Sequence, residues 1–145
     1  MGVENMAAEL RHGPSAFSPE QFVKLAASVW GSQIDLGKTA SALERTINIG
    51  AWMDDRLVGS VRILSDGYLM SMVTEIMVDP AHRREGIGLQ LVRAALEAAP
   101  GGRLFLGAQP GDEVFFEKAG FRRGPAGFVG RRDGPGAAHD LRPDA

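Results

Sequence analysis

The chain has 145 residues, 44% of them hydrophobic and 23% charged, and its formal net charge is −2. These values are typical of a globular protein with one hydrophobic core and give no sign of a strongly basic nucleic-acid-binding face. The sequence holds no cysteine, which excludes disulfides, thiolate metal sites and a cysteine nucleophile.

The start of the chain, MGVENMAAEL, lacks the basic-then-apolar layout of a secretory signal. No later stretch approaches the roughly 20 apolar residues that a membrane-spanning helix requires. We therefore expect a cytoplasmic protein that uses no metal and has neither a nucleic acid nor a membrane as its partner.

Two helices are expected in the first third of the chain, after a short edge strand near Ala7 to Arg11. The first lies in FSPEQFVKLAASVWG, where Ser18 and Gln21 are spaced as a capping box and Gly31 is a stop signal. A second, weaker helix is expected from Thr39 to Arg45.

A change of pattern follows, because INIGAWM, LVGSVRIL and YLMSMVTEIMV are rich in β-branched and long apolar residues. The turn signals DDR and SDG separate these runs. Three strands with such tight links predict an antiparallel meander.

The last part of the chain alternates between strand and helix signals. HRREGIG leads into a helix expected from Ile87 to Ala99, followed by a short strand in RLFLGA, a helix in DEVFFEKAG and a final strand in PAGFVGRR. A strand–helix–strand unit after a meander predicts a mixed α/β sheet. We expect a single domain over residues 1–132 and a flexible C-terminal tail over residues 133–145.

The glycines of HRREGIG admit two interpretations. Gly86 and Gly88 can form a mere tight turn, or they can let a ligand approach main-chain amides at the positive end of a helix. Leu91 stands where the dinucleotide fingerprint needs a third glycine, and no Gly-Lys-Ser/Thr follows as in a P-loop. With Arg83 and Arg84 beside it, the segment can still hold a pyrophosphate through backbone donors.

The spacing Arg83-x-x-Gly86-x-Gly88 resembles the acetyl-CoA loop of the GNAT N-acetyltransferases. TEIMVDPAHRREGIGLQLV is similar to the central strand, loop and helix of that family, and FFEKAGF, at residues 115–121, is similar to its later FYEKLGF signature. The resemblance extends over roughly residues 18–132.

The resemblance implies a GNAT-type acyl-CoA N-acyltransferase fold, in which the meander precedes a β-α-β unit with splayed parallel strands. It implies acetyl-CoA as cosubstrate, with its pantetheine arm in the gap between those strands. The positions assigned to the cofactor in this way are Ile76, Met77, Val78, Arg83, Arg84, Glu85, Gly86, Ile87, Gly88, Phe115, Phe116 and Lys118.

The reaction of the family is acyl transfer from a thioester to an amine, and an alkylamine with a pKa of about 10 is mostly protonated at neutral pH. A general base is therefore useful. Glu75 lies in an otherwise apolar strand, where several family members place an acidic residue toward the amine, so it is the candidate base. The alternative is that Glu75 is paired with an arginine or exposed at a sheet edge.

The family often protonates the departing thiolate with a tyrosine, but the matching position here is Phe116. Tyr68, the one tyrosine of the sequence, is a candidate replacement. Water, Ser71 or Thr74 are others, and a thiolate whose conjugate acid has a pKa of about 8.5 can also leave unaided.

In the family, the region after the first helix walls the acceptor site. The residues that the resemblance places at this apolar rim are Trp30, Ile34 and Leu36.

The resemblance implies an N-acetyltransferase that moves an acetyl group from acetyl-CoA to a primary amine of a small molecule by direct attack in a ternary complex. A protein or peptide acceptor is an alternative. A catalytically silent CoA-binding sensor is another, favoured by the missing hydroxyl of Phe116. A homodimer is also open, because dimers are frequent in the family.

Overall fold

The computed structural model describes residues 7–133. They divide into two compact units, one ending at Leu106 and the other beginning at Gly107. The first unit contains, in chain order, β1 (Glu9–His12), η2 (Gly13–Ser15), α1 (Pro19–Trp30), α2 (Leu36–Leu43), β2 (Ile47–Met53), β3 (Arg56–Ser65), β4 (Ser71–Val78), η3 (Pro80–His82), α3 (Ile87–Ala98) and η4 (Pro100–Gly102). The second contains α4 (Glu113–Lys118). No helix within residues 7–133 is long and apolar enough to cross a bilayer.

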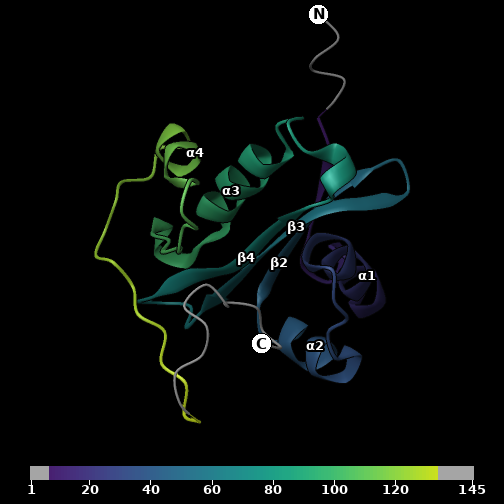
Figure 1. The fold of residues 1–145 in the computed structure, drawn as a ribbon, viewed down its shortest axis with the longest axis horizontal. Coiled ribbons are helices and arrows are strands. Elements are labelled where there is room, and N and C mark those ends of the chain that lie inside the picture. Colours follow the sequence, from purple (N-terminus) through teal and green to yellow (C-terminus); the bar gives the residue numbers. More distant parts are fainter. Residues whose placement is uncertain (1–6, 134–145) are drawn as a thin grey trace, which may run out of the picture. The chain divides into compact units, whose positions relative to one another are not determined.

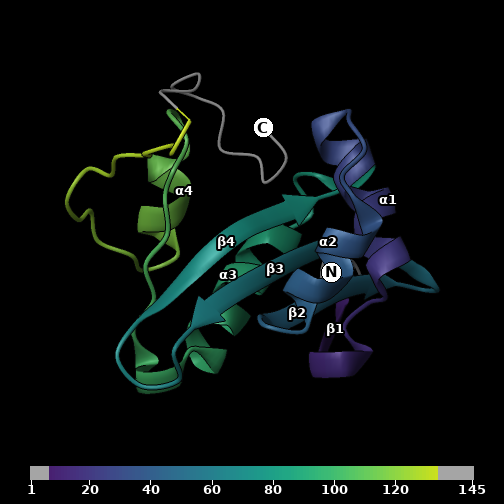
Figure 2. The same ribbon diagram turned by 90° about the horizontal axis from the view of Figure 1, so that it is seen from below.

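The first unit is an antiparallel sheet with helices on both faces. Its strands follow one another in the order β1-β2-β3-β4, so the expected meander is confirmed. Helix α3 lies on one face, and α1 and α2 lie on the other (Figures 1 and 2). The apolar sides of these helices and of the strands form the core, which supplies most of the stabilisation.

Local sequence signals determine where α1 and α2, the two helices on the same face of the sheet, begin and end. The Ser18 hydroxyl accepts a hydrogen bond from the Gln21 amide at 3.1 Å, and the Ser18 amide donates to Gln21 Oε1 at 2.8 Å, which confirms the capping box. Helix α1 ends at Trp30, and Gly31 is its C-cap in the left-handed conformation, as the stop signal predicts. Helix α2 begins earlier than predicted, because Asp35 caps it by accepting from the Lys38 amide at 2.7 Å.

Two predicted strands are absent from the described residues. The run at 103–108 pairs through Phe105 alone, in one parallel bridge with Met72. The run at 125–132 is irregular and fully exposed. Glycines at 127 and 130 interrupt it, and glycine loses more conformational freedom in a strand than any other residue.

The turn between β3 and β4 is organised by the carboxylate of Asp66. Its Oδ1 accepts hydrogen bonds from the amides of Tyr68, Leu69 and Met70 at 2.7–3.1 Å. These bonds, that of Tyr68 first, lower the pKa of Asp66 because they stabilise the charged form. The turn therefore has a defined shape while Tyr68 and Leu69 are 86% and 85% exposed.

Strand β2 passes very close to the segment that precedes α1. The Trp52 indole donates a hydrogen bond to the Ala16 carbonyl oxygen at 2.8 Å. A Cβ atom on Gly50 would collide with the same oxygen and would also press on Phe17 and Leu57. Glycine at position 50 is thus required by close packing between two backbones.

Gly50→Ala is expected to lower the free energy of unfolding by about 1–3 kcal/mol or more, since the new methyl group overpacks a site bounded by backbone. Urea unfolding monitored by circular dichroism measures the change. Gly127→Ala is the matched control, because a Cβ there meets nothing within 4 Å. Equal unfolding midpoints for the two variants would contradict this account of Gly50.

Candidate active site

Within residues 7–106, the outer edge of β4 is paired with another segment at one place, Phe105. The Val73 amide donates to the Phe105 carbonyl oxygen at 2.8 Å, and the Phe105 amide donates to the Ser71 carbonyl oxygen at 2.9 Å. Among the described residues, parallel pairing at this edge is confined to that single bridge. The part of β4 beyond Val73 therefore offers main-chain groups to a ligand.

The direction of these groups follows from the ladder on the opposite side. The Asp79 amide donates to the Val58 carbonyl oxygen at 2.8 Å, so it points toward β3. Amide directions alternate along a strand, which turns the Met77 amide toward β3 and those of Ile76 and Val78 toward the open edge. Of the three backbone positions expected at a ligand, Ile76 and Val78 thus have the suitable orientation, while the Met77 side chain is buried in the core.

The open edge leads into a loop with an uncapped helix start. Arg84 and Gly86 have φ of 65° and 83°, and this left-handed geometry turns successive amides toward a common side. Gly86 is the N-cap of α3 and provides no side-chain hydrogen bond. The first-turn amides, those of Ile87 and Gly88 among them, are consequently available to an anion at the positive end of a 12-residue helix.

The charged side chains of this loop have different surroundings. Arg83 and Arg84 are exposed, and the Arg83 Nε donates to the Val78 carbonyl oxygen at 3.4 Å. Glu85 Oε1 lies 3.1 Å from His82 Nδ1, so the one acidic side chain of the loop has a partner. The loop thus combines bare amides with two solvent-facing cations.

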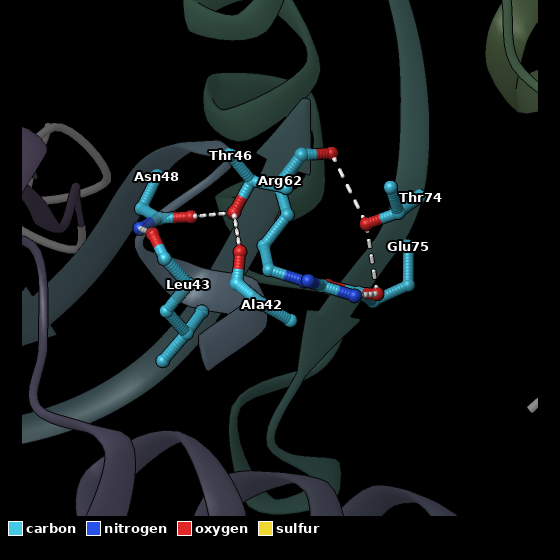
Figure 3. A network of polar contacts seen from close by, with 7 residues as sticks. All are labelled: Ala42, Leu43, Thr46, Asn48, Arg62, Thr74 and Glu75. Atoms are coloured by element: carbon cyan, nitrogen blue, oxygen red, sulfur yellow. Dashed lines mark hydrogen bonds and ion pairs between the residues drawn. The ribbon is translucent and has the colours of Figure 1, made fainter. Parts of the chain in front are cut away.

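On the face of the sheet covered by α1, Glu75 is paired with Arg62 (Figure 3). Arg62 Nε and Nη2 donate to the two carboxylate oxygens at 2.6 and 2.7 Å, and each side chain is 10% exposed. Thr74 Oγ1 donates to Glu75 Oε1 at 2.9 Å, and the Phe22 ring centre lies 5.4 Å from Arg62 Cζ. The ion-pair alternative left open by the sequence is therefore present, and the role of Glu75 as a base stays a prediction.

A β-bulge places Glu75 on this face. Ile63 pairs with Val73 and Arg62 pairs with Glu75, so Thr74 is an extra residue in β4. Glu75 and Arg62 consequently lie opposite each other, where cross-strand side chains meet.

Figure 3 also shows the polar contacts that tie the end of α2 to the start of β2. Thr46 Oγ1 donates to Asn48 Oδ1 at 2.7 Å, and Asn48 Nδ2 donates to the Leu43 carbonyl oxygen at 2.9 Å. These bonds hold α2 against the sheet beside Arg62.

The remaining predicted site residues of the first unit occupy separate places. Tyr68 is in the turn before β4, at the far end of that strand from the loop with bare amides. Ile34 is a buried member of the core cluster, and Trp30 packs against that cluster. Ile34 and Leu36 also line a shallow groove beside the outer face of α1, which does not include Trp30.

The second unit contains the other three predicted site residues, Phe115, Phe116 and Lys118, and all three lie in α4. The rings of Phe115 and Phe116 lie edge to face at 5.1 Å, and Phe116 meets Phe121 at 6.3 Å. Lys118 is exposed. Their assignment to a cofactor stays a prediction.

Sequence reasoning missed Arg62 and the bulge at Thr74. A signal for Arg62 was present, because it is the one charged residue inside LVGSVRIL, next to a strand whose one charged residue is Glu75. Isolated charges in neighbouring apolar strands must find partners. No group of three or more acidic, histidine or cysteine side chains within residues 7–133 is arranged to hold a metal ion.

An open strand edge that runs into an uncapped helix start offers backbone groups to an elongated ligand with an anionic group. Residues 15–132 match the model of the acetyltransferase (GNAT) domain. The chain therefore belongs to the GNAT acetyltransferase family, whose members use acetyl-CoA.

Individual relatives agree with this membership. The chain is 40% identical over 84 residues to mycothiol acetyltransferase of Brachybacterium faecium, an alignment that covers 57% of this chain but 24% of that protein. It thus spans about a quarter of this curated relative.

Solved structures share the fold. A crystal structure from Deinococcus radiodurans superposes with a TM-score of 0.71 at 23% identity, over 88% of this chain and 90% of the other. The ribosomal-protein-S18-alanine N-acetyltransferase of Escherichia coli does so with a TM-score of 0.67 at 15% identity, over 87% and 86%.

Arg62→Met is expected to lower the free energy of unfolding by roughly 3 kcal/mol, because it leaves the Glu75 carboxylate buried without its partner. The double variant Arg62→Met/Glu75→Gln should recover part of this loss. Chemical unfolding of the wild type, both single variants and the double variant gives the coupling energy. Strict additivity of the two single effects would show that the pair contributes nothing.

Proposed function

We propose that the protein transfers an acetyl group from acetyl-CoA to the primary amine of a small molecule, by direct attack in a ternary complex. The observation that carries this proposal is the open edge of β4 leading into the uncapped start of α3. The two features are adjacent along the chain and suit the two chemically different parts of one cofactor, an amide-containing arm and a diphosphate.

The residues of the site fit this cofactor. A Cβ atom on Gly86 would meet nothing within 4 Å, so space for a phosphate lies beside the bare amides. We assign the pantetheine arm to the main chain of Ile76 and Val78. The diphosphate is assigned to the amides from Arg84 to Gly88, with Arg83 adding positive charge. The bound cofactor supplies an acetyl thioester, which is an activated acyl donor.

We assign the proton transfer to Glu75. An alkylamine must lose a proton before its nitrogen can attack, and a carboxylate can accept this proton directly or through one water. Arg62 and Thr74 hold the carboxylate in one position by three hydrogen bonds. Phe116 has no hydroxyl for the departing sulfur, which we propose leaves as the thiolate when the C–S bond breaks. The second nitrogen proton, which the new C–N bond makes acidic, passes to solvent water.

Two other functions are favoured by single observations. The Escherichia coli structural neighbour is named for acetylation of a protein's alanine, so a peptide acceptor is the second candidate. Phe116, in place of a tyrosine, favours the third, a sensor that binds CoA without turnover.

The family match across residues 15–132 supports our proposal that the two compact units belong to one domain.

Thiol release from acetyl-CoA, measured with a panel of primary amines and short peptides, tests the function. We expect turnover with at least one small amine and an N-acetylated product in the mass spectrum. Glu75→Gln should lower kcat about 10²–10⁴-fold while changing the Kd for CoA little, and Glu97→Gln, at an exposed position of α3, is the control. CoA binding without turnover on any acceptor would instead support the sensor, and turnover on peptides alone would support the second candidate.

The variants Gly86→Glu and Gly86→Lys form a matched pair that tests whether the diphosphate binds at the start of α3. Both introduce a long side chain at the same left-handed position, but their charges are opposite. Calorimetry should give a Kd for CoA at least about tenfold weaker for the glutamate variant than for the lysine variant, or about 1.4 kcal/mol. Equal affinities would place the phosphates elsewhere.

A further inference from the structure

An exposed row of apolar side chains crosses the sheet of the first unit beside the Arg62–Glu75 pair. Its members are Leu64, Met72 and Phe105, which are 51%, 46% and 38% exposed. Leu64 pairs with Met72 across β3 and β4, and Met72 pairs with Phe105 in the parallel bridge. Paired residues direct their side chains to the same face, so the three side chains form one continuous row.

The row lies on the same face as the ion pair. Leu64 is two residues after Arg62 on β3, and residues two apart in a strand share a face about 7 Å from each other. On β4, Met72 and Glu75 are three residues apart, a spacing that would put them on opposite faces of a regular strand. The bulge at Thr74 places both side chains on the face of the ion pair.

The helices of this face do not extend over the row. Figure 2 shows α1 and α2 over one end of β3 and β4, while the end at the β3–β4 turn projects beyond them. Arg103 borders the row, with Cζ 5.1 Å from the Phe105 ring centre. Contiguous exposed apolar surface on a folded protein commonly marks a binding site.

We propose that the row binds the apolar body of the acceptor, whose amine then lies at Glu75. The inference rests on the proposed function and narrows the acceptor to amines that carry an alkyl or aromatic group. The continuity of the row with the Arg62–Glu75 pair favours this occupant, because a single molecule can contact both. A polar acceptor would leave the three side chains in water and gain nothing from them.

Two amines of matched length test the row. Hexylamine carries an alkyl chain, and 2-(2-aminoethoxy)ethanol replaces two of its chain positions with oxygen. We expect kcat/KM to be about tenfold higher for hexylamine. Leu64→Ser should remove this preference, whereas Leu69→Ser, which alters an exposed leucine of the same hairpin outside the row, should keep it. Equal kcat/KM for the two amines in the wild type would overturn the proposal that the row binds the acceptor, and it would leave the proposed function standing.

A binding readout separates the two claims. In protein labelled with ¹³C at the methionine methyl groups, hexylamine should shift the Met72 signal saturably in the presence of CoA, and the polar analogue should not. If this shift occurs without turnover, the row binds apolar amines but the proposed function fails. If neither the shift nor turnover occurs, the proposal that the row binds the acceptor is overturned.

The competing possibility is that a second copy of the chain covers the row. Analytical ultracentrifugation tests it by measuring the oligomeric state. We expect Leu64→Ser to leave the oligomeric state unchanged. A wild-type dimer that dissociates in Leu64→Ser would assign the row to a subunit interface and overturn the proposal.

Discussion

The cofactor site that we propose depends on one interruption of hydrogen bonding. Within the described residues, parallel pairing at the outer edge of β4 ends at the Met72–Phe105 bridge. An unpaired strand edge is a liability, because its amides and carbonyls can pair with any other extended chain. β4 nevertheless has a fixed position, since it pairs with β3 on both sides of the bulge at Thr74 and buries Met77 beneath α1. The main chain of Ile76 and Val78 is thereby held ready at an edge that does not need it for folding. This arrangement separates the groups that stabilise the strand from the groups available to a ligand.

A second use of irregular backbone occurs on the covered face. The extra residue at Thr74 breaks the alternation of β4 and sets Glu75 opposite Arg62. The resulting ion pair is nine-tenths buried and fully aligned, and burying two charges requires such alignment to offset their desolvation. The same bulge aligns Met72 with Leu64 on this face. One inserted residue therefore determines both the polar and the apolar parts of the surface that we assign to the acceptor.

Much of the fold was predictable from local signals, and the parts that were not depend on contacts between distant residues. The capping box at Ser18 and the stop at Gly31 act within a few residues, so their outcome can be read from the sequence. The turns that define the meander do likewise, and so does the glycine pattern at the start of α3. The reduction of residues 103–108 to one bridge could not be read in this way, because their apolar pattern also suits a continuous strand. The bulge at Thr74 and the identity of Arg62 as the partner of Glu75 depend on the register of β3 against β4, which no short segment contains.

Amide hydrogen exchange of Ile76, Met77 and Val78, measured with and without CoA, shows whether the outer edge of β4 holds the cofactor. We expect Met77 to be protected in both conditions by its pairing with β3. Ile76 and Val78 should exchange fast in the free protein and slow by about tenfold or more when CoA is bound, because the ligand then supplies the missing partners. Protection of Ile76 and Val78 without CoA, or an exchange rate that CoA binding leaves unchanged, would contradict the open edge as the cofactor site.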